Sequence, residues 1–269
     1  CSRRTTCPQP TSHLATMSML LKIAAQRRLD VAAAKKVKEE SALQAEIAAH
    51  PPPPANDFLA ALRANAPMAL LAEIKRASPS KGEIAMSVHA PAQAVEYALG
   101  GACTISVLTE PTWFKGTLED LRQVRRALTS AGCGGVCVLR KDFIIDQYQL
   151  LEARASGADT ALLIVALLPL EELLPLIAFS RDLGMEPLVE VANEAEMSIA
   201  LEAGSKVIGI NNRNLHTFEV DMGTTARLTS MVTTDSGIVV VALSGVSTRE
   251  DVKAFADAGA AGGLIGESL

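Results

Sequence analysis

The sequence predicts an α/β protein, a (β/α)8 TIM barrel with an N-terminal helical extension. Eight short apolar segments recur along the chain, and amphipathic segments that are typical of helices separate them. The predicted strands span residues 69–74, 104–108, 136–139, 160–165, 187–191, 207–210, 238–243 and 262–265. Strands that alternate with helices form a parallel sheet, and eight such units close into a barrel. An open, doubly wound sheet is the alternative, but no G-x-G-x-x-G follows the first strand.

The composition agrees with this fold and excludes several classes of function. Hydrophobic residues make up 49% of the 269 residues and aromatic residues only 3%, so the core is aliphatic and suits strands buried on both faces. A net charge of −5 gives no basic surface for nucleic acid, and no apolar run reaches the roughly 20 residues needed to cross a bilayer. Cys133 and Cys137 have no second Cys or His pair nearby, so we expect no metal site.

The N-terminal part divides into two segments before the barrel, which spans residues 56–269. Residues 1–16 are rich in Ser, Thr, Arg and Pro, which indicates a disordered tail or a linker from an upstream domain, and the expected location of the protein is then cytoplasmic. The alternative is the end of an organelle transit peptide, which would place the protein in a plastid. Residues 17–55 form the helical extension, with one helix predicted to about residue 48 before the prolines 51–54. A short helix over 58–64 then opens the barrel domain.

The end of the chain suggests that the barrel is incomplete. Only a few residues follow the eighth strand, so we expect the eighth helix to be truncated and the natural chain to continue. An apolar strip would then be exposed along residues 261–264 and 69–71.

Two helix starts are predicted from cap residues. For the last helix before the eighth strand, the spacing of Ser247 and Glu250 predicts a capping box, and Asn193 is the predicted cap of an earlier helix.

Polar residues gather where the predicted strands end. The residues are Glu73 and Lys75 (first strand), Lys141 (third), Glu190 (fifth), Asn211 and Arg213 (sixth) and Ser244 (seventh). A charge at one strand end can simply mark the exit to solvent. Five strand ends with the same pattern favour an active site instead, because the C-terminal ends of barrel strands form one face. A lysine with two carboxylates in a partly desolvated mouth can carry out acid–base catalysis.

Two turns have the features of a phosphate site. Ser244-Gly245 follows the seventh strand and Gly266-Glu267-Ser268 follows the eighth, where such barrels commonly hold phosphate on backbone N–H groups. Ordinary βα-turn glycines are the alternative for either turn alone, and their joint occurrence favours phosphate. We therefore expect a small phosphorylated substrate. His216 is expected to be an exposed loop residue.

Four segments resemble the indole-3-glycerol phosphate synthase family. They are residues 72–82 (AEIKRASPSKG), 106–116 (SVLTE through FKG), 140–143 (RKDF) and 208–215 (IGINNRNL). The first is highly specific, and the resemblance runs from about Leu21 to Leu269. It implies closure of the indole ring of 1-(2-carboxyphenylamino)-1-deoxyribulose 5-phosphate with loss of carbon dioxide and water, a carboxy-lyase reaction of tryptophan biosynthesis that needs no cofactor.

The resemblance also implies a role for each site residue. Lys141 would be the main general acid and Glu190 a partner acid or base, while Glu73 would assist ring formation. Lys75 would hold an anionic group, Asn211 and Arg213 would orient the anthranilate portion, and Phe143 would pack against its ring. Ser78, Gly245, Gly266 and Glu267 would surround the phosphate, and Ser244 and Leu264 complete the substrate-binding set.

The sequence departs from the family pattern at two positions. Leu243 stands where many bacterial members carry Glu, and Glu267 replaces a frequent Ser; the first change resembles fungal-type members, which are often one domain of a multifunctional tryptophan-pathway chain. Fusion to, or association with, such domains is therefore expected. Two rival functions stay open: a phosphosugar aldolase or isomerase with Lys141 as a Schiff-base nucleophile, and a non-catalytic phosphate-binding barrel.

Overall fold

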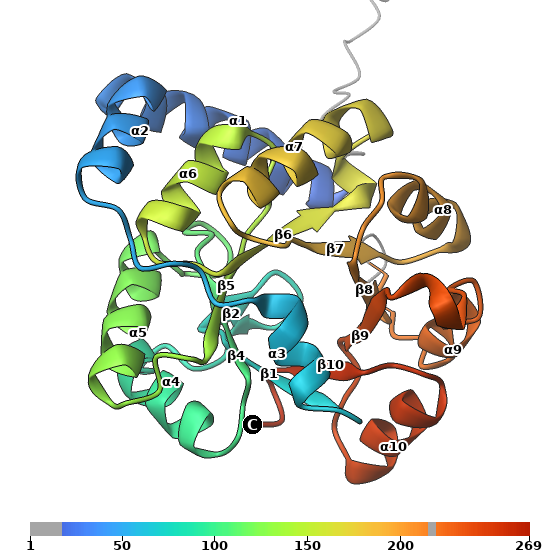
Figure 1. The fold of residues 1–269 in the computed structure, drawn as a ribbon. Helices are drawn as coiled ribbons and strands as arrows, with labels where there is room; N and C mark the ends of the chain where they lie inside the picture. Colours follow the sequence, from blue (N-terminus) through green and yellow to red (C-terminus); the bar gives the residue numbers. More distant parts are fainter. Residues whose placement is uncertain (1–17, 215–218) are drawn as a thin grey trace, which may run out of the picture.

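The computed structural model describes residues 18–214 and 219–269, in which eight parallel strands close into a barrel (Figure 1). The barrel strands are β1 (Ala69–Ile74), β4 (Thr104–Leu108), β5 (Cys137–Lys141), β6 (Thr160–Ile164), β7 (Leu188–Val191), β8 (Val207–Asn211), β9 (Val239–Leu243) and β10 (Gly262–Ile265). Pairing of β1 with β10 closes the barrel, with Leu71 opposite Leu264. The predicted TIM barrel is confirmed, and the eight predicted strands match within two residues at each end.

Helices surround the barrel, as alternation along the chain requires (Figure 1). They are α4 (Ala90–Leu99), α5 (Leu118–Ser130), α6 (Gln147–Ala155), α7 (Leu170–Asp182), α8 (Glu194–Glu202), α9 (Gly223–Thr229) and α10 (Arg249–Asp257). A small hairpin, β2 (Ala77–Ser78) and β3 (Gly82–Glu83), lies in the β1–α4 loop, and two 3-10 turns, η2 (Val165–Leu167) and η3 (Thr234–Ser236), complete the fold. The barrel strands are buried on both faces, because aliphatic side chains fill the interior and the helices cover the outside.

Helix caps fix where two of these helices begin. Asn193 caps α8 as predicted, since its side chain accepts the N–H of Glu196. The predicted capping box of α10 is wrong by one residue: Thr248 and Asp251 form it, each side chain accepting the other's backbone N–H. Thr248 and Asp251 have the same spacing as Ser247 and Glu250, so the pattern alone does not distinguish the two starts.

The helical extension consists of two helices rather than the one predicted. Helix α1 (Met19–Val37) ends at Lys38, whose backbone is extended, and α2 (Glu40–Ala49) follows. The hydroxyl of Tyr148 in α6 donates a 3.0 Å hydrogen bond to the Lys38 carbonyl. In a continuous helix this carbonyl would accept a backbone N–H, so here a tertiary contact satisfies it instead. Leu20 and Ile23 of α1 belong to the same core as the barrel. The division of the chain at residue 55 stays a prediction.

The barrel wall beside β10 and β1 exposes less apolar surface than expected. Among residues 69–71 and 261–264, only Leu70 and Ala261 are half-buried, and the others are buried. Part of the reason is that Gly262 and Gly263 have no side chain to expose. Helix α3 (Phe58–Ala64) contacts β9 and buries Phe58 and Leu62 in the core.

Among the described residues, none of the helices combines the length and the apolar character that a membrane-spanning helix needs.

Candidate active site

A cavity of about 560 Å³ opens where the barrel strands end, a size that suits a small organic ligand. Every site residue that the sequence predicted lines it: Glu73, Lys75, Ser78, Lys141, Phe143, Glu190, Asn211, Arg213, Ser244, Gly245, Leu264, Gly266 and Glu267. These residues come from β1, β5, β7, β8, β9 and β10 or from the loops after those strands.

The predicted loop residue His216 lies outside the described residues. Within them, no group of three His, Cys, Asp or Glu side chains could hold a metal ion.

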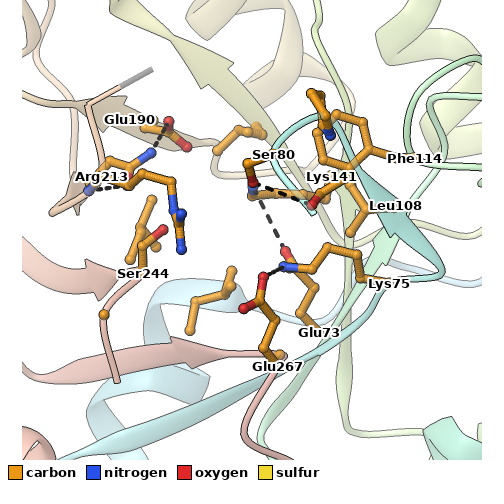
Figure 2. A pocket seen from close by; sticks show the side chains of 18 of the residues that line it. Glu73, Lys75, Ser80, Leu108, Phe114, Lys141, Glu190, Arg213, Ser244 and Glu267 are labelled. Carbon is orange, nitrogen blue, oxygen red and sulfur yellow. Dashed lines mark hydrogen bonds and ion pairs between the residues drawn. The ribbon is translucent and has the colours of Figure 1, made fainter. Parts of the chain in front are cut away.

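Glu73 lies between two lysines on one side of the cavity (Figure 2). Its Oε1 is 3.0 Å from Lys75 Nζ and its Oε2 is 3.8 Å from Lys141 Nζ. Burial opposes the charged carboxylate, but the two lysines outweigh it and lower the pKa of Glu73. Burial also opposes the charge of Lys75, yet Glu73 raises the pKa of that lysine above its ordinary value. Glu73 is therefore ionised and Lys75 protonated at neutral pH.

Glu190 and Arg213 lie across the cavity from this group (Figure 2). The amide of Asn211 donates a 2.9 Å hydrogen bond to Glu190 Oε1, and Asn211 Oδ1 accepts the backbone N–H of Arg213 at 2.9 Å. Asn211 thus fixes both the carboxylate and the backbone that carries the guanidinium. The resemblance implies that Glu190 is the acid–base partner of Lys141, but the carboxylate that forms an ion pair with Lys141 is that of Glu73.

The turns after β9 and β10 lie together at the same rim. Ser244 and Gly245 both have positive φ, at 64° and 86°, a backbone conformation that glycine adopts without strain. A hydroxyl hydrogen bond of 2.8 Å from Ser268 to the Val246 carbonyl joins the two turns. Ser78 is buried at this end of the cavity, and its Oγ accepts the backbone N–H of Lys81 at 3.3 Å.

Glu267 forms ion pairs with two lysines at this rim. Its Oε1 is 3.5 Å from Lys75 Nζ, and its Oε2 pairs with Lys81 of the β2–β3 hairpin. Burial opposes the charge of Glu267, but Lys81 and Lys75 outweigh it and lower the pKa of the carboxyl. Lys81 was not predicted as a site residue, although it lies inside the recognised segment 72–82.

The cavity has an aromatic and apolar wall that the sequence analysis found only in part. Phe143 was predicted, but its neighbour Phe114 was not; their ring centroids are 5.8 Å apart and their planes are tilted by 41°. Met19, Leu20 and Ile23 of α1 also line the cavity. Phe114 lies inside another recognised segment, 106–116, whereas no strand-end pattern points to α1. Leu243 lines the cavity as an apolar side chain.

A buried charge network supports the backbone beside Lys141. The carboxylate of Asp142 is paired with the guanidinium groups of Arg27 (3.1 Å) and Arg140 (3.1 Å) and accepts a 2.5 Å hydrogen bond from Thr109. Burial opposes the charge of Asp142, but Arg140 and Arg27 lower its pKa below the ordinary range. Arg27 belongs to α1, so this network joins the extension to the residue that follows Lys141 in the chain.

Comparison with known proteins shows the family of the chain. The family model described as indole-3-glycerol phosphate synthase matches residues 20–269. The chain belongs to the indole-3-glycerol phosphate synthase family. It is 43% identical to "Indole-3-glycerol phosphate synthase" of Roseiflexus sp. (strain RS-1), over 94% of this chain and 93% of that protein.

Other family relatives are longer proteins. The chain is 52% identical to "Multifunctional tryptophan biosynthesis protein" of Phycomyces blakesleeanus and 50% identical to the protein of that name from Schizosaccharomyces pombe. The matches cover 94% of this chain but 33% of each of those proteins, so the chain spans about a third of their length.

Solved structures with low sequence identity share the fold. N-acetylmannosamine-6-phosphate 2-epimerase from Clostridium perfringens superposes with a TM-score of 0.59 at 13% identity, over 79% of this chain and 90% of that one. Thiamine phosphate pyrophosphorylase from Pyrococcus furiosus gives 0.55 at 15% identity, over 75% and 88%. At these identities the likeness supports the barrel architecture alone.

Proposed function

We propose that the protein is an indole-3-glycerol phosphate synthase, a carboxy-lyase that converts 1-(2-carboxyphenylamino)-1-deoxyribulose 5-phosphate to indole-3-glycerol phosphate. The observation that carries this proposal is the placement of Lys141, Glu73 and Glu190 in one cavity, between an aromatic wall and two joined glycine turns. The cavity thus offers proton donors and acceptors, a surface for a ring and N–H groups for a phosphate. Membership in the family supports the same assignment.

The substrate's ends fit opposite parts of the cavity. Its phosphate would bind at the turns of Gly245 and Gly266, where backbone N–H groups can approach it closely. Its carboxyphenyl ring would lie against Phe143, with Arg213 and Asn211 beside the carboxylate and Lys75 available to an anionic group. Ser78, Ser244, Leu264 and Glu267 would line the phosphate end. In this orientation the ketone of the ribulose chain would lie within the part of the cavity that Lys141 and Glu190 line.

Lys141 would donate a proton to the ketone oxygen, which makes the ketone carbon electrophilic. The ring carbon that bears the carboxylate then attacks this carbon, and loss of carbon dioxide restores the aromatic ring. The hydroxyl left on the former ketone carbon departs as water once an acid protonates it and a base removes a proton from the neighbouring carbon. Glu190 and Glu73, which both line the cavity, would carry out these proton transfers, and the reaction exchanges no electrons with a cofactor.

The assay of this proposal is direct. The purified protein, incubated with the carboxyphenylamino substrate, should produce the fluorescence of an indole and release one carbon dioxide per indole formed. Absence of both products from the folded protein would reject the assignment. Sodium borohydride added with substrate should leave Lys141 unmodified; a covalent adduct there would favour the Schiff-base enzyme instead.

The proposal extends to the cellular setting. By analogy with the multifunctional relatives, we infer that the chain is one domain of a larger tryptophan-biosynthesis protein or associates with such domains. The expected cytoplasmic location stays a prediction, and its plastid alternative depends on residues 1–16, which lie outside the described structure.

A further inference from the structure

Glu110 is a completely buried carboxylate directly behind the aromatic wall, with 0% of its surface exposed. It lies two residues beyond β4, and the proposed reaction does not use it. The two oxygens of Glu110 accept three successive backbone N–H groups: Thr112 at 2.8 Å on Oε1, and Trp113 at 2.7 Å and Phe114 at 3.0 Å on Oε2. Charge-assisted hydrogen bonds of this kind are among the stronger ones in proteins.

The backbone that Glu110 holds lies in a loop at the surface. Thr112 and Lys115 are exposed, whereas Trp113 and Phe114 are half-buried. The loop closes on itself through a 3.0 Å hydrogen bond from Gly116 N–H to the Glu110 carbonyl. A side chain at Gly116 would place its Cβ 1.9 Å from the Leu108 carbonyl oxygen, so the end of the loop touches the end of β4.

We propose that Glu110 is a positioning residue that holds Phe114 against Phe143 and thereby shapes the binding surface for an aromatic ring. The three amides it accepts include that of Phe114 itself, and the Phe114 ring lines the cavity 5.8 Å from Phe143. The identity of the bound aromatic ring as the carboxyphenyl group of the substrate rests on the proposed function. The positioning of Phe114 by Glu110 does not rest on it.

Glu110→Gln tests the proposal with almost no change of shape. The variant replaces one acceptor oxygen by an NH2 group, which faces N–H donors and leaves at least one of the three backbone amides without an acceptor. We expect KM for the carboxyphenylamino substrate to rise at least tenfold, while the affinity for inorganic phosphate stays within twofold. Glu119→Gln, a change at an exposed glutamate of α5, is the matched control and should alter neither quantity.

A double mutant separates positioning from a general loss of stability. If Glu110 acts through Phe114, Glu110→Gln combined with Phe114→Ala should have a KM within twofold of Phe114→Ala alone. The proposal would be overturned if the increase in KM of the double variant equalled the product of the two single increases. It would also be overturned if Glu110→Gln lost phosphate affinity as much as it lost substrate affinity.

Trp113, the only tryptophan of the chain, gives a readout that needs no activity. Its emission should shift in Glu110→Gln and not in Glu119→Gln; unchanged emission of Glu110→Gln would contradict the proposal even if the wild type catalyses the reaction.

If Glu110→Gln does not fold, hydrogen exchange of the backbone amides of the wild type tests the proposal. The amides of Trp113 and Phe114 should be strongly protected although they lie in a surface loop, and exchange at the rate of an unstructured peptide would overturn the proposal. A wild type without synthase activity but with these protected amides would refute the proposed function alone.

Discussion

Glu73 Oε2 lies 3.8 Å from Lys141 Nζ, although the two residues belong to β1 and β5 and β4 lies between those strands. Both side chains point into the cavity from the ends of their strands (Figure 2). The carboxylate of Glu73 therefore forms an ion pair with the lysine that we propose as the general acid.

Glu73→Gln should lower kcat by about 10²- to 10⁴-fold, the usual contribution of a positioned acid or base. KM should change much less, because the charge of Glu73 is directed at Lys75 and Lys141 rather than at the substrate's anionic groups. Steady-state kinetics of the variant beside the wild type measure both constants. A kcat within a factor of five of the wild type would show that Glu73 has no part in the proton transfers.

Glu267→Gln should strengthen the binding of inorganic phosphate about fivefold, or about 1 kcal/mol. The carboxylate of Glu267 forms ion pairs with Lys75 and Lys81, and its negative charge repels an anion that binds at the turns. Titration calorimetry with phosphate measures the change, and Glu250→Gln in α10, an exposed glutamate, is the control. Weaker binding in Glu267→Gln would mean that the carboxylate helps to hold the phosphate.

Gly245→Val should weaken phosphate binding at least tenfold. A Cβ at this position would lie 2.6 Å from Met222 Sδ, and φ of +86° strains any side chain, so the turn must move. Gly204→Ala is the control, because Gly204 also has positive φ, at 69°, but no atom within 4 Å of an added Cβ. The control should lose stability and keep its phosphate affinity; unchanged affinity in Gly245→Val would place the phosphate elsewhere.

Asp142→Asn should destabilise the fold by about 3 kcal/mol, since it removes the buried carboxylate that the guanidinium groups of Arg27 and Arg140 share and leaves them only their less buried partners Asp30 and Glu152. The pKa of Asp142 is lowered in the folded state, so its contribution is complete above the ordinary aspartate pKa and is lost as pH falls through the folded-state pKa. Urea unfolding at neutral and at strongly acidic pH measures the free energy of unfolding of both proteins. The difference between the variant and the wild type should be smaller at acidic pH. A constant difference would assign the effect to packing.

The sequence predicts the barrel and the strand-end residues well for a physical reason. Buried parallel strands need continuous aliphatic runs, and barrel geometry brings all of their C-terminal ends to one face. Glu73, Lys141 and Glu190 therefore meet in one cavity even though their separation in sequence is large.

The pairings within the site could not be predicted in the same way. Lys141 pairs with Glu73 rather than Glu190, although its strand β5 is two strands away from both β1 and β7, so strand order does not distinguish the two carboxylates. At the break of the first helix, the Lys38 carbonyl accepts a hydrogen bond from the hydroxyl of Tyr148, a contact between distant segments that no local pattern predicts. Phe114 is held by the buried carboxylate of Glu110 through backbone groups, which leave no residue pattern.

The measurement that tests the central claim most directly is the turnover and substrate affinity of Lys141→Ala. If Lys141 is the general acid, it acts chiefly in the transition state, so kcat should fall by about 10³-fold or more while the dissociation constant of the substrate stays within about tenfold. Single-turnover indole fluorescence and equilibrium titration on the same preparation give the two values. A variant that retains turnover within tenfold of the wild type would contradict the account.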